Sequence, residues 1–215
     1  MIQLLVGRVR RELSQEEWEI TTSNIPADMR TEIERYRRWE DRHLSLLSKL
    51  LLAEGLKIIG KDSSLTAEIK RDDFGRPFIC EDFDFNISHS GSVAVCAFSM
   101  SGKVGVDVEI IRPVDLEDFK NYMTAEEMRL IKESGNVPGS FFSLWTQKES
   151  AIKADGRGFS IPIEDVSLAD GSALISGRKW SLTEVDIGGE YSLHVAANPG
   201  APSINVIETH LLPGN

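Results

Sequence analysis

The stretch Gly105-Val-Asp-Val-Glu-Ile-Ile111 places two carboxylates two residues apart in a run of β-branched side chains. Because side chains alternate between the two faces of a strand, Gly105, Asp107 and Glu109 lie on one face and the valines between them on the other. Mg²⁺ is often held by such a pair of carboxylates while water and a phosphorylated substrate supply its remaining ligands. On this segment alone, an amphipathic strand with solvated acids is the favoured interpretation.

The composition is that of a globular protein with an acidic surface. The chain has 215 residues, 41% of them hydrophobic, and a net charge of -10. Its length is sufficient for one domain or two small lobes. The negative charge argues against nucleic acid and against an anionic membrane as partners. Without a membrane span or signal peptide, we expect a cytoplasmic protein. Cys80 and Cys96 lie next to apolar residues without CxxC spacing and are predicted to be buried, reduced thiols.

Capping patterns and apolar spacing predict the main helices. Ser14 with Glu17, and Thr124 with Glu127, form the capping-box pattern that opens a helix. Apolar residues three and four apart predict a long helix that stops near Gly55. The predicted helices begin after Ser14 and Thr124 and cover residues 28–56 and 141–155.

Alternating and β-branched runs predict the strands. A polar loop is expected at residues 88–91, and the turn at residues 101–103 predicts that the strand of Asp107 pairs antiparallel with residues 93–98. Disorder is expected only in the Pro- and Gly-rich tail after Asn198. Hairpins dominate this mixture, so the predicted fold class is α+β. The predicted strands are residues 2–9, 83–87, 93–98, 105–111, 166–168, 179–185 and 191–196.

The helix at residues 141–155 carries a third acid. Trp145, Glu149 and Lys153 follow one another at spacings of four and share one helix face. A Glu and a Lys at this spacing ordinarily form an exposed salt bridge, but the large aromatic on the same face favours contact with protein or ligand. Together with Asp107 and Glu109, Glu149 would complete a Mg²⁺ site and could also accept a proton.

Two further segments are candidates for binding an anion. Five arginines and four acids lie within residues 30–42, a net charge of +1, which favours an exposed helix face with salt bridges. His89 lies between Ser88 and Ser90 and beside Gly91, so that hydroxyls, an imidazole and backbone amides come together. By itself, this second pattern also fits an ordinary surface histidine.

Four motifs follow one another along the chain: Gly75-Arg-Pro-Phe-Ile79, Phe85-Asn-Ile-Ser-His-Ser-Gly91, Gly105-Val-Asp-Val-Glu109, and Trp145-Thr-Gln-Lys-Glu-Ser-Ala-Ile-Lys153 followed by Gly156 and Gly158. In their order and spacing they resemble the Sfp-type 4′-phosphopantetheinyl transferases of the holo-carrier-protein synthase superfamily. The resemblance covers nearly the whole chain, and four motifs in order leave little room for coincidence.

The resemblance implies a monomer of two similar α/β lobes, an intramolecular pseudo-dimer with the active site in the cleft between them. Residues 1–102 would form the lobe on the 3′-phosphate and adenine side of coenzyme A, and residues 103–215 the lobe of the metal-binding acids and the catalytic helix. The implied reaction is Mg²⁺-dependent transfer of phosphopantetheine from coenzyme A to a serine of an apo acyl carrier protein or of a peptidyl or aryl carrier domain. The implied second product is adenosine 3′,5′-bisphosphate.

The resemblance also assigns roles to the residues of the reaction. Asp107, Glu109 and Glu149 match the metal-binding acids, and Glu149 also matches the residue proposed to deprotonate the serine. Lys153 matches a lysine that contacts the pyrophosphate, and His89 with Ser88 matches phosphate contacts. The stretch at residues 114–128, between the metal strand and the Glu149 helix, is our candidate for the surface that docks the carrier protein.

The coenzyme A side matches less closely. Where the family commonly has a basic residue in its first long helix, this chain has Leu44, and the neighbouring arginines are displaced. Guanidinium groups bind phosphate from several directions, so these arginines could serve instead. The coenzyme A contacts that the resemblance implies are Arg35, Arg38, Arg42, Gly75, Arg76, Pro77, Ser88, His89 and Lys153.

Three other interpretations stay open. A protein of the same fold could bind coenzyme A or a carrier protein without catalysing transfer, although all three metal-binding acids are present. A Mg²⁺-dependent phosphohydrolase would use the same acids with water as the nucleophile. In the third interpretation, every motif is structural and the chain is an α+β domain without an active site.

Overall fold

The computed structural model describes residues 1–23, 25–200 and 203–214. The strands are β1 (Ile2–Arg8), β2 (Lys70–Arg71), β3 (Pro77–Phe78), β4 (Asp84–Ser90), β5 (Val93–Ser99), β6 (Val104–Ile110), β7 (Ser167–Ala169), β8 (Ser172–Ile175), β9 (Arg178–Glu184), β10 (Tyr191–Ala197) and β11 (Ile204–Thr209). The α-helices are α1 (Gln15–Thr22), α2 (Ala27–Glu34), α3 (Trp39–Ile58), α4 (Ala125–Glu133) and α5 (Val137–Asp155). Short 3₁₀ helices are η1 (Ser63–Glu68), η2 (Leu116–Phe119), η3 (Gly158–Ser160) and η4 (Ile163–Asp165).

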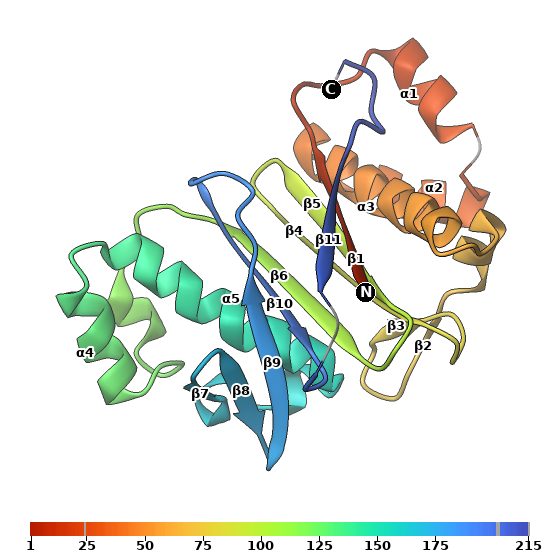
Figure 1. Cartoon of the computed structure of the whole chain (residues 1–215). Coiled ribbons are helices and arrows are strands. Elements are labelled where there is room, and N and C mark those ends of the chain that lie inside the picture. The colour runs from red at the N-terminus through yellow and green to blue at the C-terminus, as the bar shows by residue number, and fades with distance from the viewer. Residues whose placement is uncertain (24, 201–202, 215) are drawn as a thin grey trace.

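The chain forms two lobes, each a sheet covered by helices, which confirms the predicted α+β class (Figure 1). The first sheet has the strand order β11-β1-β5-β4 and carries α1, α2 and α3 on its side of the molecule. The second has the order β6-β10-β9-β8-β7, and α5 packs along β6 and β10. Strands β2 and β3 form a separate hairpin beside the first lobe.

The two sheets share an apolar core. In β1, Leu5 packs into the core that contains the buried face of α3, whereas Leu4 and Val6 belong to a second core. Val106 of β6 and Val195 of β10 belong to that same second core. Alternation along each strand thus buries both faces of the central strands, and the two lobes pack on each other through the second core.

The long helix predicted for residues 28–56 is two helices, α2 and α3. Arg38, the residue before α3, has extended backbone with φ -83° and ψ 138°. The preceding Ile33 is fully buried, but Tyr36 is 45% exposed. The segment between the helices therefore lacks an apolar residue that holds it on the core, and the periodic apolar pattern is interrupted there.

Gly55 does not end α3, contrary to the prediction. It lies within the helix against the ring of Phe98 on β5, where an added Cβ would be 2.0 Å from Phe98 Cε2. The helix ends at Ile58, and Gly60 follows with φ 75°. Gly55 is therefore required for close packing, and the left-handed residue that favours glycine comes five positions later.

Strand β4 includes three of the residues that were predicted to form a polar loop. Ser88, His89 and Ser90 pair with β5 to the end of the strand. Only Gly91, with φ 60°, and Ser92 are left to make the turn. A polar strand end forms here because Ser88 and Ser90 hydrogen-bond to β6 instead of facing an apolar core.

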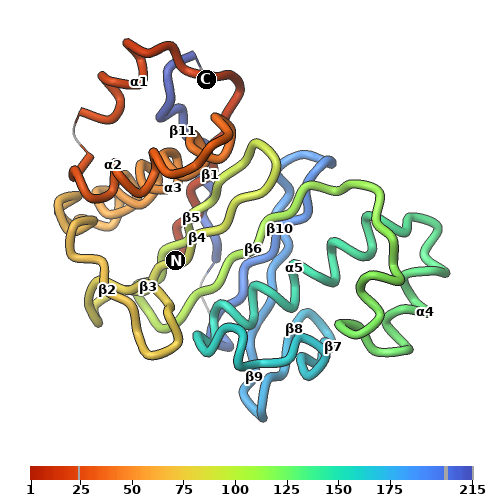
Figure 2. The backbone as a smooth tube through the Cα atoms, turned by 180° about the vertical axis from the view of Figure 1, so that it is seen from behind, coloured from red at the N-terminus to blue at the C-terminus, as the bar shows by residue number. Residues whose placement is uncertain are grey.

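The predicted pairing of β6 with β5 is wrong. Strand β5 is central in its sheet, with β1 on one edge and β4 on the other, so it has no free edge for β6. Instead, β6 pairs antiparallel with β10, with Asp107 opposite His194. Its other edge runs beside β4, as both backbone views show (Figures 1 and 2).

The tail that was predicted to be disordered contains β11. This strand pairs in parallel with β1, from Ile2 opposite Ile204 to Gly7 opposite Thr209. Residues 201–202 and 215 of the tail lie outside the described residues. The apolar side chain of Ile207 packs on the core of the first lobe, which explains why the segment is ordered. The predicted lobe of residues 103–215 thus returns its last strand to the first sheet.

The two capping predictions are confirmed. Both capping boxes are present, at Ser14 and at Thr124. Helix α5 begins four residues before the predicted start because Pro138 is accommodated in its first turn. Both cysteines are free, and Cys96 is buried, but Cys80 is only half-buried, contrary to the prediction. No helix in the described part of the chain has the length and apolar character needed to cross a bilayer.

Candidate active site

Side chains of β4 cover the free edge of β6. Every second residue of β4 accepts a hydrogen bond from a backbone N–H of β6, and because both strands have a period of two the offset stays constant. The pairs, acceptor first, are Asp84 with Val104 (2.8 Å), Asn86 with Val106 (2.9 Å), Ser88 with Val108 (3.4 Å) and Ser90 with Ile110 (3.1 Å). The first lobe thereby satisfies backbone donors of the second lobe and fixes the position of β6.

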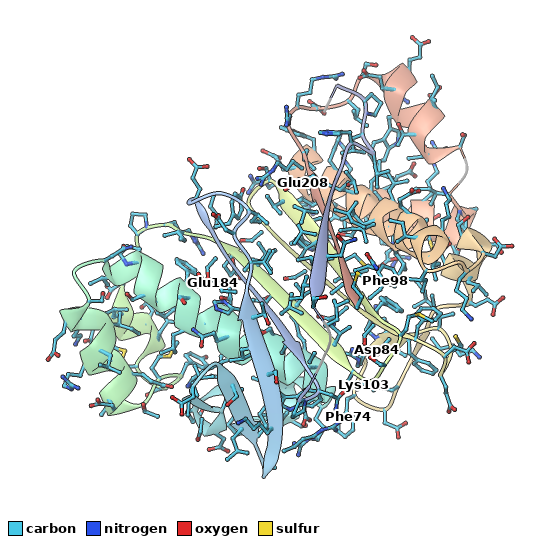
Figure 3. All side chains as sticks on the ribbon, viewed as in Figure 1. Phe74, Asp84, Phe98, Lys103, Glu184 and Glu208 are labelled. Carbon is cyan, nitrogen blue, oxygen red and sulfur yellow. The ribbon has the colours of Figure 1, made fainter. Side chains whose placement is uncertain are left out.

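Arg76 closes one end of this contact between the lobes. The residue is 7% exposed, and its guanidinium donates to the Asp84 carboxylate (2.6 Å), to the Val104 carbonyl (2.8 Å) and to the Lys153 carbonyl of α5. Lys103 also lies 3.4 Å from Asp84, and both residues are labelled in Figure 3. Arg76 thus connects β4, β6 and α5, and its assignment with Gly75 and Pro77 as a coenzyme A contact stays a prediction.

Helix α5 lies unusually close to β6 at Gly105. A Cβ added to Gly105 would be 2.0 Å from the Ser150 carbonyl oxygen and 2.4 Å from the Ala154 nitrogen. Only glycine allows this approach of helix backbone to strand. The approach brings Glu149 and Lys153 of α5 over the strand face that carries Asp107, as the shared face of Gly105 and the acids predicts.

Asp107 is buried and pairs with Lys153. The Lys153 ammonium lies 2.6 Å from Asp107 Oδ1 and also donates to Ser88 Oγ at 3.0 Å. Ser88 Oγ donates to the same Asp107 oxygen at 2.9 Å. The other oxygen of Asp107, Oδ2, is buried without a hydrogen-bond partner among the described residues. Lys153 of α5 therefore neutralises part of the negative charge of Asp107 on β6.

Glu109 and Glu149 carry raised pKa values. The pKa of Glu109 is raised mainly by burial and further by the negative charge of Asp107, although a hydrogen bond from Ser90 opposes this rise. The pKa of Glu149 is raised by burial and by the negative charges of Asp107 and Glu109. The three acids thus lie close enough to repel one another, and the cluster favours positive charge.

The chemistry of this cluster fits a bound cation. A positive ion would relieve the repulsion among the acids and satisfy the unpartnered oxygen of Asp107. Within the ranges 1–23, 25–200 and 203–214, no three His, Cys, Asp or Glu side chains form a group arranged to hold a metal. Mg²⁺ is commonly held by one or two carboxylates plus substrate phosphates. The assignment of Asp107, Glu109 and Glu149 as metal ligands stays a prediction.

His89 lies on the opposite face of β4 from Ser88 and Ser90. It lines a groove of about 450 Å³ that is also bordered by Ser45 of α3 and by Arg71 of β2. Its pKa is lowered by loss of surrounding water and by the positive charge of Lys153. The two predicted phosphate contacts, Ser88 and His89, therefore face different sides of the strand.

The three arginines predicted for the 3′-phosphate differ in their surroundings. Arg42 lies 4.0 Å from Glu12 and lines a separate pocket of about 340 Å³. The exposed Arg38 lies 3.4 Å from Glu40, and Arg35 follows the end of α2. Leu44, at the position where the family often has a base, is buried in the first core, as are other apolar residues of α3.

Lys148 is a buried charged residue with a structural role that the sequence did not reveal. It is 0% exposed and donates to the carboxylate of Glu127 on α4 at 2.9 Å and to the Ile163 carbonyl at 3.2 Å. The same carboxylate forms the capping box with Thr124. Lys148 thus fixes α4 on α5. The two linked residues, Glu127 and Lys148, are 21 positions apart, so no local sequence pattern predicts the contact.

A second buried network lies under α5 beside Asp107. His194 is 4% exposed, and its Nδ1 lies 2.8 Å from Thr146 Oγ1, which also contacts Ser192 Oγ at 2.9 Å. Burial lowers the pKa of His194 to about 4. An unfolded histidine titrates near ~6.5, so the unfolded chain binds more protons than the folded protein between these values.

Stability should therefore fall as the pH drops through this window. The contribution of His194 is fully present above about pH 6.5 and is lost toward pH 4, so between pH 7 and 4.5 the wild type should lose about 2 kcal/mol more than His194→Gln. Urea unfolding of both proteins at several pH values measures the difference. His210→Gln, which changes an exposed histidine, is the control, and equal losses in wild type and His194→Gln would contradict the prediction.

Comparison with known proteins identifies the family. The profile described as 4'-phosphopantetheinyl transferase superfamily matches residues 103–196, and that described as 4'-phosphopantetheinyl transferase, N-terminal, matches residues 12–101. The chain is 33% identical over 165 residues to the 4'-phosphopantetheinyl transferase gsp of Aneurinibacillus migulanus, a match that covers 76% of this chain and 69% of the relative. It is 34% identical over 162 residues to the 4'-phosphopantetheinyl transferase Sfp of Bacillus subtilis (strain 168), with 74% and 72% covered.

A eukaryotic relative extends the match. The L-aminoadipate-semialdehyde dehydrogenase-phosphopantetheinyl transferase of Schizosaccharomyces pombe is 30% identical over 213 residues, with 79% of this chain and 82% of the relative covered. The chain belongs to the 4′-phosphopantetheinyl transferase superfamily, as its four motifs indicate. It is an enzyme of the phosphopantetheinyl transferase class, with the two-lobed α+β fold described above.

Proposed function

We propose that this enzyme transfers the 4′-phosphopantetheine group of coenzyme A to a serine hydroxyl of an apo carrier protein in a Mg²⁺-dependent reaction. The observation that carries the proposal is the cluster of Asp107, Glu109, Glu149 and Lys153 at the junction of the lobes. Three mutually repelling acids and one ammonium group form a set that can hold a cation and bind phosphate oxygens.

The residues of the cluster have separate roles in the proposed reaction. The serine Oγ forms a bond to the phosphorus that carries pantetheine, and the bond from this phosphorus to the bridging oxygen of the pyrophosphate breaks. The electron pair leaves with adenosine 3′,5′-bisphosphate. Glu149 of α5 is proposed to take the proton of the hydroxyl, the role of the residue that it matches in the family. Lys153 binds the pyrophosphate oxygens and stabilises their charge.

The three acids are the proposed cation ligands. Asp107 and Glu109 project from β6, and Glu149 reaches them from α5. Mg²⁺ held there would supply positive charge beside the phosphate oxygens. Ser88 and His89 face opposite sides of β4, so they are proposed to contact different phosphate groups of coenzyme A.

The carrier protein is proposed to dock on residues 114–128. Phe119 and Tyr122 lie edge-on to Trp145 of α5 at 5.5 and 6.2 Å between ring centroids, and Tyr122 is 46% exposed. The accessible Tyr122 contacts Trp145, which lies one helical turn before Glu149 on α5. This arrangement supports a docking site that would deliver a serine to the acid cluster.

Mass spectrometry tests the proposed reaction. The purified protein is incubated with apo acyl carrier and peptidyl carrier proteins, coenzyme A and Mg²⁺, and we expect one phosphopantetheine group to be added to the carrier. A carrier with its acceptor serine replaced by alanine is the control and should stay unmodified. Failure to modify any carrier while coenzyme A stays intact would support the alternative, a binding protein without transfer activity. Cleavage of coenzyme A without carrier modification would support a hydrolase.

The arrangement of the arginines predicts a weak preference for the 3′-phosphate of coenzyme A. Arg38 lies 3.4 Å from Glu40 and Arg42 lies 4.0 Å from Glu12, and an exposed charge contact contributes about 1 kcal/mol or less. We therefore expect dephospho-coenzyme A to be used with kcat/KM within about tenfold of that for coenzyme A. Steady-state kinetics with both donors and a fixed carrier measures the ratio. A preference greater than about 100-fold would mean that the arginines act together as a phosphate clamp.

A further inference from the structure

Two serines of β4 match the two acids of β6 in spacing. Ser88 lies opposite Asp107, and Ser90 lies opposite Glu109, so both pairs are 19 residues apart. Each hydroxyl contacts the carboxylate of one residue and the backbone N–H of the next one. The Ser-His-Ser and Asp-Val-Glu motifs are therefore complementary parts of one contact between the lobes.

The geometry determines the direction of the Ser90 proton. Ser90 Oγ accepts from the Ile110 N–H at 3.1 Å, so its own hydrogen is available for Glu109 Oε2, which lies 2.5 Å away. A short hydrogen bond from a hydroxyl to a carboxylate is among the stronger ones in proteins. The Ile110 N–H thus orients Ser90, and Ser90 in turn restricts the rotation of the Glu109 carboxylate.

The two acids differ in how much they depend on these serines. Asp107 also pairs with Lys153 at 2.6 Å, so loss of the Ser88 hydroxyl leaves it with a strong partner. The Glu109 carboxylate, in contrast, has Ser90 as its one hydrogen-bond donor among the described residues 1–23, 25–200 and 203–214. The orientation of the Glu109 carboxylate therefore rests mainly on one hydroxyl from the other lobe.

We propose that Ser90 is a positioning residue that holds the Glu109 carboxylate in the orientation needed to bind the divalent cation. This inference rests on the proposed function. It means that cation binding by the second lobe depends on a side chain of the first lobe. Partners that orient metal ligands typically change metal affinity by about 10- to 100-fold when they are removed.

The matched pair Ser90→Thr and Ser90→Val tests the role of the hydroxyl, because the two side chains have the same shape and differ in that group. Mn²⁺ binding is measured by electron paramagnetic resonance with coenzyme A present, and the Mg²⁺ concentration for half-maximal transfer is measured separately. We expect Ser90→Val to weaken Mn²⁺ binding and raise the Mg²⁺ requirement by about tenfold or more. Ser90→Thr should stay within about threefold of wild type, and kcat at saturating Mg²⁺ should change little in either variant. Ser92→Ala, in the turn that follows β4, is the control for loss of a hydroxyl.

The outcomes separate this inference from the proposed function. Unchanged Mn²⁺ affinity in Ser90→Val, or an equal loss in Ser90→Thr, would overturn the positioning role, even if the melting temperature falls. Wild-type protein that binds no Mn²⁺ would overturn both the cation assignment and the inference. Wild-type protein that binds Mn²⁺ with the expected difference between the variants, but modifies no carrier, would overturn the transfer reaction alone.

Discussion

Replacing Asp107 by asparagine should lower the rate of transfer on the order of 1000-fold while the protein stays folded. The substitution removes the charge that is proposed to hold the cation, and it removes the counter-charge that orients Lys153 at 2.6 Å. The asparagine amide oxygen can still accept hydrogen bonds from Ser88 and Lys153, so the β4 and β6 contact survives. We therefore expect a large loss of kcat with a cooperative thermal transition close to that of wild type.

Transfer to an apo carrier protein, followed by mass spectrometry at several time points, measures the rate. Glu164→Gln removes an exposed acid of the same lobe and should keep wild-type activity. A folded Asp107→Asn protein that transfers at nearly the wild-type rate would remove Asp107 from the active site. A variant without a cooperative transition would instead show that the Asp107 pair is needed for folding.

Gly105→Ala should destabilise the protein and lower activity together. The added Cβ would lie 2.0 Å from the Ser150 carbonyl oxygen, and a backbone atom cannot move aside as a flexible side chain can. Overpacking of this kind costs about 3 kcal/mol, which corresponds to a melting temperature lower by about 10 °C for a chain of this size. Because relief of the clash moves α5 away from β6, Glu149 should be displaced from Asp107 and transfer should slow at temperatures where the variant is folded.

Differential scanning calorimetry and transfer assays at 15 °C measure the two effects. Gly189→Ala is the matched control, since an added Cβ there meets no atom within 4 Å. A Gly105→Ala protein with the melting temperature and activity of the Gly189→Ala protein would show that α5 tolerates a wider separation from β6.

Features with a local cause were predictable from the sequence. The capping boxes at Ser14 and Thr124 depend on residues three positions apart, and both are formed. The common face of Gly105, Asp107 and Glu109 follows from strand alternation, and the closeness of the helix at Gly105 is consistent with it. The residues of each capping box and of the common strand face are only a few positions apart, so their geometry follows from the backbone period.

Errors arose where a distant partner decided the local structure. Gly55 resembles a helix stop, but the ring of Phe98 requires a glycine at that point inside α3. Ser88 and Ser90 resemble a loop, but the edge of β6 supplies donors that make a polar strand favourable. The tail after Asn198 resembles a disordered end, but the open edge of β1 pairs with β11. The determining group in each case lies in another element.

The sequence by itself determined the family and the residues that we propose for the chemistry, because the four motifs and the strand alternation around Asp107 and Glu109 are local patterns that can be identified without the fold. Only the tertiary structure decided how those residues are paired. Lys153 bonds to Asp107 rather than serving as the i+4 partner of Glu149, and Ser90 of the first lobe holds Glu109 of the second. The physical reason is that many polar groups could form each pair, and the selection among them depends on the close packing of α5 on β6 and on the edge that β6 presents to β4.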